Sequence, residues 1–235
     1  LQDFGGPENS VMPFLAGDID ALPEMSGQET LIPQLQTVKN AVVLKDQWPS
    51  IWYIAPNYRV YPLNVYEVRK AIDLAVNKDE LINIALNGYA DKPLMGYIPP
   101  VNTKYADFSL TWAGEGVAQD VRVAEANAIL DSLGYALGKD GVRIADDGSR
   151  MSYSLMCLSM YPSYVRAAEM IKNYLAQIGI EITVETKDPN TLFGEIVFNG
   201  NGGDKWQLLL HGSTIGTDPV DITSEWAPDS TDAWY

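Results

Sequence analysis

A short segment near the end of the chain holds side chains of the kinds that perform covalent chemistry. His211 and Ser213 are followed by Asp218, and a histidine beside a serine or an acid is the minimum set for a hydrolase. His211 is the chain's only histidine, and it ends an apolar run, where a structural imidazole is the more common role. A hydrolase that uses His211 is therefore an alternative function and not the leading one.

The remaining reactive groups also argue against an enzyme. Cys157 is the single cysteine, which excludes an internal disulfide, and its apolar neighbours predict a buried structural thiol. Turn capping explains Asp18 and Asp20 better than a metal pair does. The sequence contains no Walker loop and no GxGxxG, HExxH or paired CxxC motif. We predict a protein that is not an enzyme, with no catalytic residue, metal or cofactor.

The composition is that of a globular protein with a sizeable core. The chain has 235 residues, of which 46% are hydrophobic and 20% charged. Its net charge of −15 argues against a nucleic-acid partner, because phosphate binding requires clustered lysine and arginine. No apolar run approaches the ~20 residues of a membrane-spanning helix.

The clearest structural pattern lies in residues 64–100 and predicts two consecutive helices. Asn77 has the position of an N-cap for the second helix, with Glu80 completing a capping box. Gly88 stands where a left-handed C-terminal stop is expected. The first helix is predicted from apolar residues at the spacing of one buried stripe: Val68, Ala71, Ile72, Ala75 and Val76.

Periodicity and turn residues predict further elements of an α/β fold. Residues 101–116 have no clear period, but their aromatic residues indicate a packed loop. The expected helices cover 26–35, 123–133, 163–178 and 191–196. The expected strands cover 18–22, 41–44, 50–55, 151–155, 180–185 and 206–211, the last of these buried on both faces.

Several motifs at fixed spacing connect these elements. They are Asn57, Tyr61-Pro62, Val68-Arg69-Lys70-Ala71-Ile72, Ala75-Val76-Asn77-Lys78-Asp79, Gly88 and Ile98-Pro99-Pro100, with shorter phrases at 15–20, 128–135, 175–180 and 212–219. Together they closely resemble a signature of the family 5 extracellular solute-binding proteins. Members of that family are the oligopeptide-, dipeptide- and nickel-binding components of ABC importers.

The resemblance implies a fold and a domain organisation. The fold would be the second lobe of a type II periplasmic-binding-protein-like fold, an α/β lobe with a mixed sheet flanked by helices. The likeness covers nearly the whole chain but only about half of a family member. Residues 1–235 are therefore expected to form a single ligand-binding lobe without the first lobe and the final helices. Such an excised lobe should bind ligand weakly or not at all, because half of the cleft is missing.

The resemblance also implies a function in transport. The protein would capture a peptide-like or other polar small solute between two lobes and deliver it to the permease subunits of an ABC transporter. It would be a monomer without a nucleic-acid partner, and extracytoplasmic, either periplasmic or lipid-anchored outside the membrane. A sugar- or oligosaccharide-binding member of the same family remains an alternative, as does a signalling or scaffold module that binds a partner protein.

The resemblance locates the candidate site and marks two departures. In peptide-binding members two acids hold the ligand's α-ammonium group, and their positions correspond to Ala55 and Gly216. A loop tryptophan of the family corresponds to Ser213. An unpaired buried charge costs several kcal/mol, so recognition of a free peptide N-terminus is not expected unless Asp218 supplies the carboxylate. The candidate ligand-binding residues are Trp52, Tyr53, Asn57, Tyr97, Tyr161, His211, Ser213, Thr214, Gly216 and Asp218.

Overall fold

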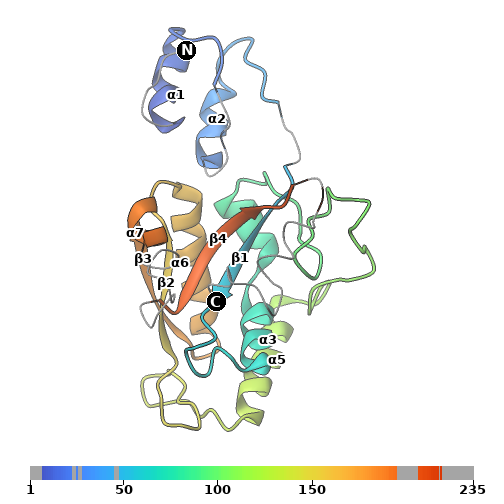
Figure 1. The fold of residues 1–235 in the computed structure, drawn as a ribbon, viewed down its shortest axis with the longest axis vertical. Helices are drawn as coiled ribbons and strands as arrows, with labels where there is room; N and C mark the ends of the chain where they lie inside the picture. The colour runs from blue at the N-terminus through green and yellow to red at the C-terminus, as the bar shows by residue number, and fades with distance from the viewer. Residues whose placement is uncertain are drawn as a thin grey trace.

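The computed structural model describes residues 7–22, 25, 28–44, 48–194, 206–216 and 218. Its centre is a four-stranded mixed sheet with the strand order β1-β4-β2-β3 (Figure 1). β1 (Ser50–Pro56) pairs antiparallel with β4 (Leu208–Thr214). β4 pairs in parallel with β2 (Ser152–Leu158), which pairs in parallel with β3 (Glu181–Lys187). This mixed sheet is the α/β architecture that the sequence predicts.

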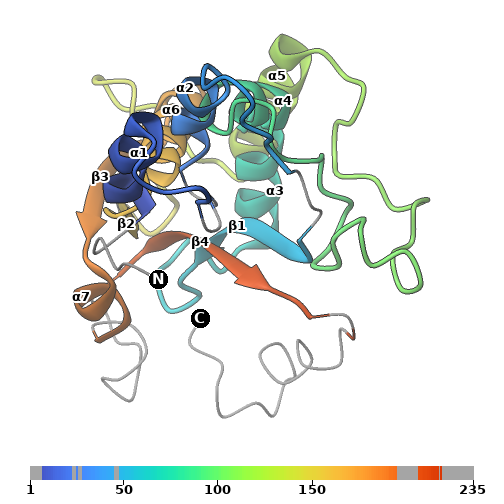
Figure 2. The same cartoon turned by 90° about the horizontal axis from the view of Figure 1, so that it is seen from above.

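The long helices lie on one face of the sheet (Figure 2). They are α3 (Tyr66–Ala75), α5 (Gln119–Ser132) and α6 (Pro162–Ala176), and they share the larger hydrophobic core with the sheet. The short helix α7 (Pro189–Phe193) lies on the opposite face, where a smaller apolar cluster forms around Trp206. Strand β4 therefore has apolar layers on both sides, as its continuous run of leucines predicts.

Shorter helical elements complete the described fold. The N-terminal segment forms α1 (Pro7–Ala16), the 3₁₀ turn η1 (Glu29–Leu31) and α2 (Ile32–Leu35). The predicted second helix of residues 64–100 is α4 (Lys78–Glu80), continued by the π-helical turn η2 (Leu81–Ala85).

The predicted caps of this helix pair are present. The Asn77 side-chain oxygen accepts a hydrogen bond from the Glu80 backbone N–H at 3.2 Å, as an N-cap must. Gly88 has a φ of +76°, the left-handed conformation that a C-terminal stop requires. The N-cap and the left-handed residue therefore stand where the pattern predicts. The capping box is incomplete, because the Glu80 carboxylate accepts from the Asn77 side chain and not from its backbone N–H.

Two predicted strands are wrong, and one predicted helix is much shorter than expected. Residues 18–22 and 41–44 form no strand, because neither segment pairs with another strand of the described chain. Val42 and Leu44 are 78% and 88% exposed, so no sheet covers the apolar side of that segment. The helix expected over 26–35 is confined to η1 and α2, because Pro33 has no N–H to extend it backwards. Ser26, its expected cap, lies outside the described residues.

The boundaries of the last strand also differ from the prediction. β4 begins at Leu208, two residues after the predicted start, and continues through Gly212 and Ser213 to Thr214, three residues beyond the predicted end. The extension follows from pairing, because Ser50 to Trp52 of β1 lie opposite Thr214 to Gly212. Register with a distant strand, which local sequence does not encode, sets this end.

A buried asparagine joins the ends of β1 and β4. The Asn57 side chain is fully buried and donates from Nδ2 to the Trp206 carbonyl at 2.8 Å. Its Oδ1 accepts from the Arg59 backbone N–H at 3.0 Å, and its own N–H donates to the Gln207 carbonyl at 2.9 Å. Asn57 thus fixes the start of β4 against the end of β1.

Replacing Asn57 by alanine should destabilise the fold. The Trp206 carbonyl and the Arg59 N–H would lose their side-chain partner, which costs about 1–3 kcal/mol when the group is buried. Urea unfolding followed by circular dichroism measures the change. Asn64→Ala is the control, because Asn64 is exposed and the change should stay within about 0.5 kcal/mol. Equal losses in both variants would show that Asn57 does not hold this junction.

Candidate functional site

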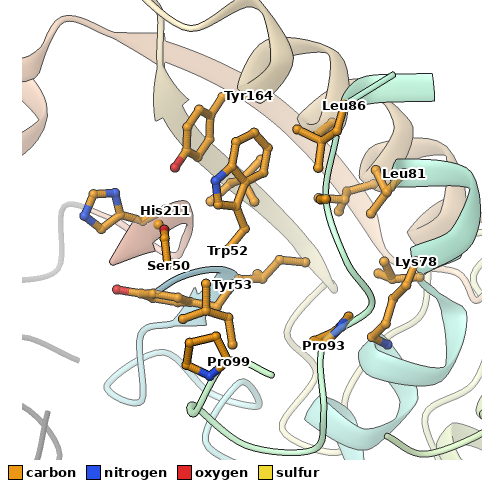
Figure 3. A pocket seen from close by; sticks show the side chains of 18 of the residues that line it. Ser50, Trp52, Tyr53, Lys78, Leu81, Leu86, Pro93, Pro99, Tyr164 and His211 are labelled. Carbon is orange, nitrogen blue, oxygen red and sulfur yellow. The ribbon is translucent and has the colours of Figure 1, made fainter. Parts of the chain in front are cut away.

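An open groove of about 1250 Å³ runs along β1 and the adjoining end of β4. Its walls come from β1, α3, α4, η2, the segment 89–101 and the first turns of α6. Because β1 is an edge strand, side chains from both faces of the sheet line the groove. Figure 3 shows Trp52, Tyr53, Tyr164 and His211 around this space.

A stacked aromatic pair forms the wall on the helix side. The rings of Trp52 on β1 and Tyr164 on α6 lie 4.0 Å apart with an interplanar angle of 19°. Gly212 lies opposite Trp52 in the β-ladder. A Cβ atom at Gly212 would lie 2.5 Å from the Tyr164 hydroxyl and 2.9 Å from Trp52 Cδ1. The stack therefore fits against the strand only because residue 212 has no side chain.

A second aromatic group lies on the other face of the same two strands. Tyr53 pairs with His211 in the ladder, and their rings meet edge to face at 6.1 Å. The Phe193 ring approaches His211 from α7 at 5.6 Å, and the Tyr97 ring lies 5.3 Å from Tyr53. Tyr53 Oη and Ser213 Oγ share a hydrogen bond at 3.0 Å. This face offers a ring-lined surface with a few polar atoms, the composition usual for a small-molecule site.

His211 combines burial with an unused nitrogen. Burial lowers the pKa of the imidazole below its ordinary value, so the ring is neutral at pH 7. Its Nδ1 atom is buried and has no hydrogen-bond partner among the residues that the structure describes. An unpaired buried polar atom beside a groove is a hydrogen-bonding group available to a bound solute.

The geometry does not support a hydrolase. The Ser213 hydroxyl bonds to Tyr53, and no hydrogen bond joins His211 to Ser213 or Asp218 within the described chain. Cys157 is fully buried, and burial raises its thiol pKa to about 11, so it is not a nucleophile at neutral pH. In the described ranges, no cluster of three or more His, Cys, Asp or Glu is placed to hold a metal ion.

Of the other candidate residues, some line the groove and some do not. Tyr161 lines it as the N-cap of α6, and Thr214 does so at the end of β4, where its hydroxyl accepts from Trp48 Nε1 at 3.2 Å. Asn57 is buried and has the structural role given above. The Gly216 carbonyl accepts from Asn102 Nδ2 at 3.0 Å, while Asp218 is exposed.

The groove is also lined by residues that the sequence interpretation did not propose for the site, among them Tyr164, Phe193, Trp48 and Glu29. Tyr164 lies one helical turn before Ala167 on the apolar stripe of α6, so its inward direction could have been read from the spacing. Phe193 has no such signal, because α7 brings it to the groove from a segment far from β1. Trp48 lies two residues before β1 and bonds to Thr214 on the partner strand. Glu29 is an acid at the groove, but its carboxylate accepts a hydrogen bond from Ser163 Oγ at 2.5 Å.

The mixed sheet, with its long helices on one face and an open, ring-lined groove along its edge, has the form of an α/β lobe. The chain belongs to a family of such proteins. The family model described as "Bacterial extracellular solute-binding proteins, family 5 Middle" matches residues 4–233. Within the described residues, no helix combines the length and apolarity needed to cross a membrane.

Known proteins are similar to this chain in sequence or in fold. The "Di/tripeptide-binding protein 1" of Pseudomonas aeruginosa is 28% identical over 172 residues, which are 72% of this chain and 28% of that protein. Lactococcal OppA, solved with an endogenous peptide in the closed conformation, matches with a TM-score of 0.75 at 21% identity, over 91% of this chain and 41% of its own. A Thermotoga maritima oligopeptide-binding protein, solved with bound mannohexaose, matches with a TM-score of 0.66 at 21% identity, over 97% of this chain and 42% of its own. The chain thus spans less than half of each of these proteins.

The close approach of Gly212 to Tyr164 predicts that substitutions at positions 212 and 164 affect stability non-additively. Gly212→Ala should destabilise the protein by about 1–3 kcal/mol, because the added methyl overlaps the Trp52–Tyr164 stack. Combining it with Tyr164→Phe removes the nearest overlapping atom and should recover part of that loss. Urea unfolding of the single and double variants gives the interaction energy. Gly194→Ala is the control, since a Cβ there meets nothing within 4 Å; strict additivity at positions 212 and 164 would contradict the overlap.

The depressed pKa of His211 predicts a pH dependence of stability. Below the ordinary value of 6.5 the unfolded chain binds a proton that the folded chain does not, so stability is full above 6.5 and falls as the pH drops. Since the chain has one histidine, His211→Phe should flatten this slope between pH 7.5 and 5.5. Urea midpoints at the two pH values test it, and identical slopes in the two proteins would refute the assignment.

Proposed function

We propose that this chain forms one wall of the cleft of an ABC-importer substrate-binding protein, which captures a peptide-like or other polar small solute. The observation that carries the proposal is the groove along β1 and β4, lined by Trp52, Tyr53, Tyr164 and His211, in a chain of this family. The di/tripeptide-binding relative and the peptide-bound OppA support a peptide-like solute.

The proposed mechanism is hinge closure over the solute. Residues 1–235 would act as a single ligand-binding lobe, and a second lobe would cover the open side of the groove. The solute then stabilises the closed form because it touches both walls only in that form. No covalent step is needed, and the isolated lobe should bind weakly because half of the contacts are missing.

The proposed contacts follow from the chemistry of the groove. The Trp52–Tyr164 stack would bind apolar parts of the solute, and the unpaired His211 Nδ1 would provide one hydrogen bond. The positions of the family's ammonium-binding acids are Ala55, which is buried in the smaller apolar cluster, and Gly216. We therefore propose that recognition of the solute does not require an α-ammonium group bound at these two positions.

A sugar or oligosaccharide is the second candidate solute. Trp52, whose ring stacks on that of the buried Tyr164, lines the groove with an aromatic side chain, and the neighbouring Tyr53 and Ser213 hydroxyls suit a ligand rich in hydroxyl groups. The mannohexaose-bound structural neighbour supports this candidate.

The proposed setting is outside the cytoplasm, in the periplasm or attached by a lipid to the outer side of the membrane. The permease subunits of an ABC transporter would be the partner, and the binding protein would act as a monomer without nucleic acid. A signalling role would differ in its partner, and a pull-down from membrane extract that recovers a sensor protein would favour it over transport.

Trp52→Ala should weaken solute binding about tenfold or more, because a buried aromatic contact of this kind is worth about 2 kcal/mol or more. Calorimetric titration with trialanine, N-acetyl-trialanine and mannohexaose measures the effect, first on this chain and then on the protein carrying both lobes. Phe108→Ala is the matched control, since Phe108 is exposed and away from the groove. Equal losses in the two variants, or no binding of any probe by the two-lobe protein, would contradict the proposed function.

A further inference from the structure

Arg69 belongs to the helix motif Val68-Arg69-Lys70-Ala71-Ile72, but membership of that motif does not explain why its side chain lines two cavities. It projects from α3 into the wall shared by the groove and a smaller side pocket of about 230 Å³. The side pocket is lined by Arg69 together with apolar and aromatic residues, among them Tyr53, Tyr58 and Tyr97. Among the described residues no carboxylate lines it, and the guanidinium of Arg69 is the one charge they place there.

The guanidinium retains most of its hydrogen-bonding capacity. It has five N–H donors, and within the described chain one bond uses them, from Nη1 to the Leu63 carbonyl at 3.2 Å. The guanidinium carbon lies 4.5 Å from the centre of the Tyr58 ring and 6.0 Å from that of Tyr66. Neither ring contact supplies a hydrogen-bond acceptor of the carboxylate or carbonyl kind, so the N–H groups can still donate to another partner.

The other described cations of the groove are neutralised, whereas Arg69 is not. Lys78 Nζ lies 2.7 Å from an Asp73 carboxylate oxygen, and Lys70 Nζ lies 3.4 Å from that of Glu125. Arg69 has no ion pair with any described residue, although the chain carries a net charge of −15. Acidic side chains are abundant in this protein, yet none of the described ones reaches the guanidinium. The unmatched charge therefore points to a partner from outside the described chain.

We propose that Arg69 binds an anionic group of the solute, a carboxylate in the first instance, and that the side pocket receives the apolar part that carries it. The inference deepens the proposed function and rests on it, since it concerns a solute in the same groove. A carboxylate matches the edge of a guanidinium with two parallel hydrogen bonds, and this charge-assisted geometry is among the strongest available to a protein. The tyrosine rings around the pocket suit an aromatic or aliphatic group next to the carboxylate.

The test compares one probe with and without its charge. N-acetyl-phenylalanine is titrated into the 235-residue chain, and N-acetyl-phenylalanine amide serves as the neutral counterpart. Nitrogen NMR follows the Arg69 Nε–H signal, identified by its loss in Arg69→Lys, and the Trp52 indole N–H reports on the groove separately. This readout works at millimolar affinity, so it does not require the second lobe.

The expected result is a shift of the Arg69 signal with the acid and not with the amide. The acid should bind about 10- to 100-fold more tightly than the amide, as expected for hydrogen bonds to a charged group. Arg69→Met should remove that preference, and Arg69→Lys should keep only part of it, because lysine has the charge without the fork. Arg59→Met is the matched control, an exposed cation outside both cavities that should leave the preference unchanged. Thermal unfolding verifies that each variant is folded.

The contrary results separate the two proposals. If both probes shift the Trp52 signal equally and the Arg69 signal stays fixed, the anion site is refuted while solute binding in the groove stands. If the acid retains its preference in Arg69→Lys and in Arg69→Met, the charge is recognised elsewhere and the inference is wrong. If neither probe moves either signal, the anion site is refuted and the proposed function loses support as well.

Discussion

The antiparallel pairing of β1 with β4 is the interaction on which the candidate site depends. The two strands lie at opposite ends of the α/β body in sequence, so closing the intervening chain costs conformational entropy. Leu208 to Leu210 offset that cost by burying side chains in both apolar layers, and Asn57 locks the register at the junction. Without this pairing, Trp52 and Tyr53 would have no fixed relation to His211 and Gly212.

The pleat of these strands divides the groove into two chemically different walls. Trp52 and Gly212 face the long helices, whereas Tyr53, His211 and Ser213 face α7. One wall is a stacked ring surface, and the other carries hydroxyl groups and an imidazole. Because β1 is an edge strand, a single solute has access to both walls around its free edge. Arg69 adds a charged wall on α3 next to these two.

Local sequence correctly predicts those features that depend only on residues close together in the chain. The Asn77 cap, the stop at Gly88 and the apolar stripes of α3 and α6 all appear where the pattern indicates. Residues 41–44 have suitable strand composition but pair with no described strand, because a strand is defined by its neighbour and not by its own residues. Motif resemblance gave the family and the fold. The Trp52–Tyr164 stack was not predictable in the same way, because it depends on how α6 packs on a strand more than a hundred residues away.

Gly212 has a consequence for how such a protein can change over time. The rings of Trp52 and Tyr164 leave no space for a side chain at this position, so the groove surface and the sheet packing share the same atoms. A descendant that gained a side chain at residue 212 would lose stability unless Tyr164 or Trp52 changed as well. Solute preference on this wall should therefore diverge through paired substitutions, whereas the Arg69 wall, which rests on a single unpaired side chain, can diverge one residue at a time.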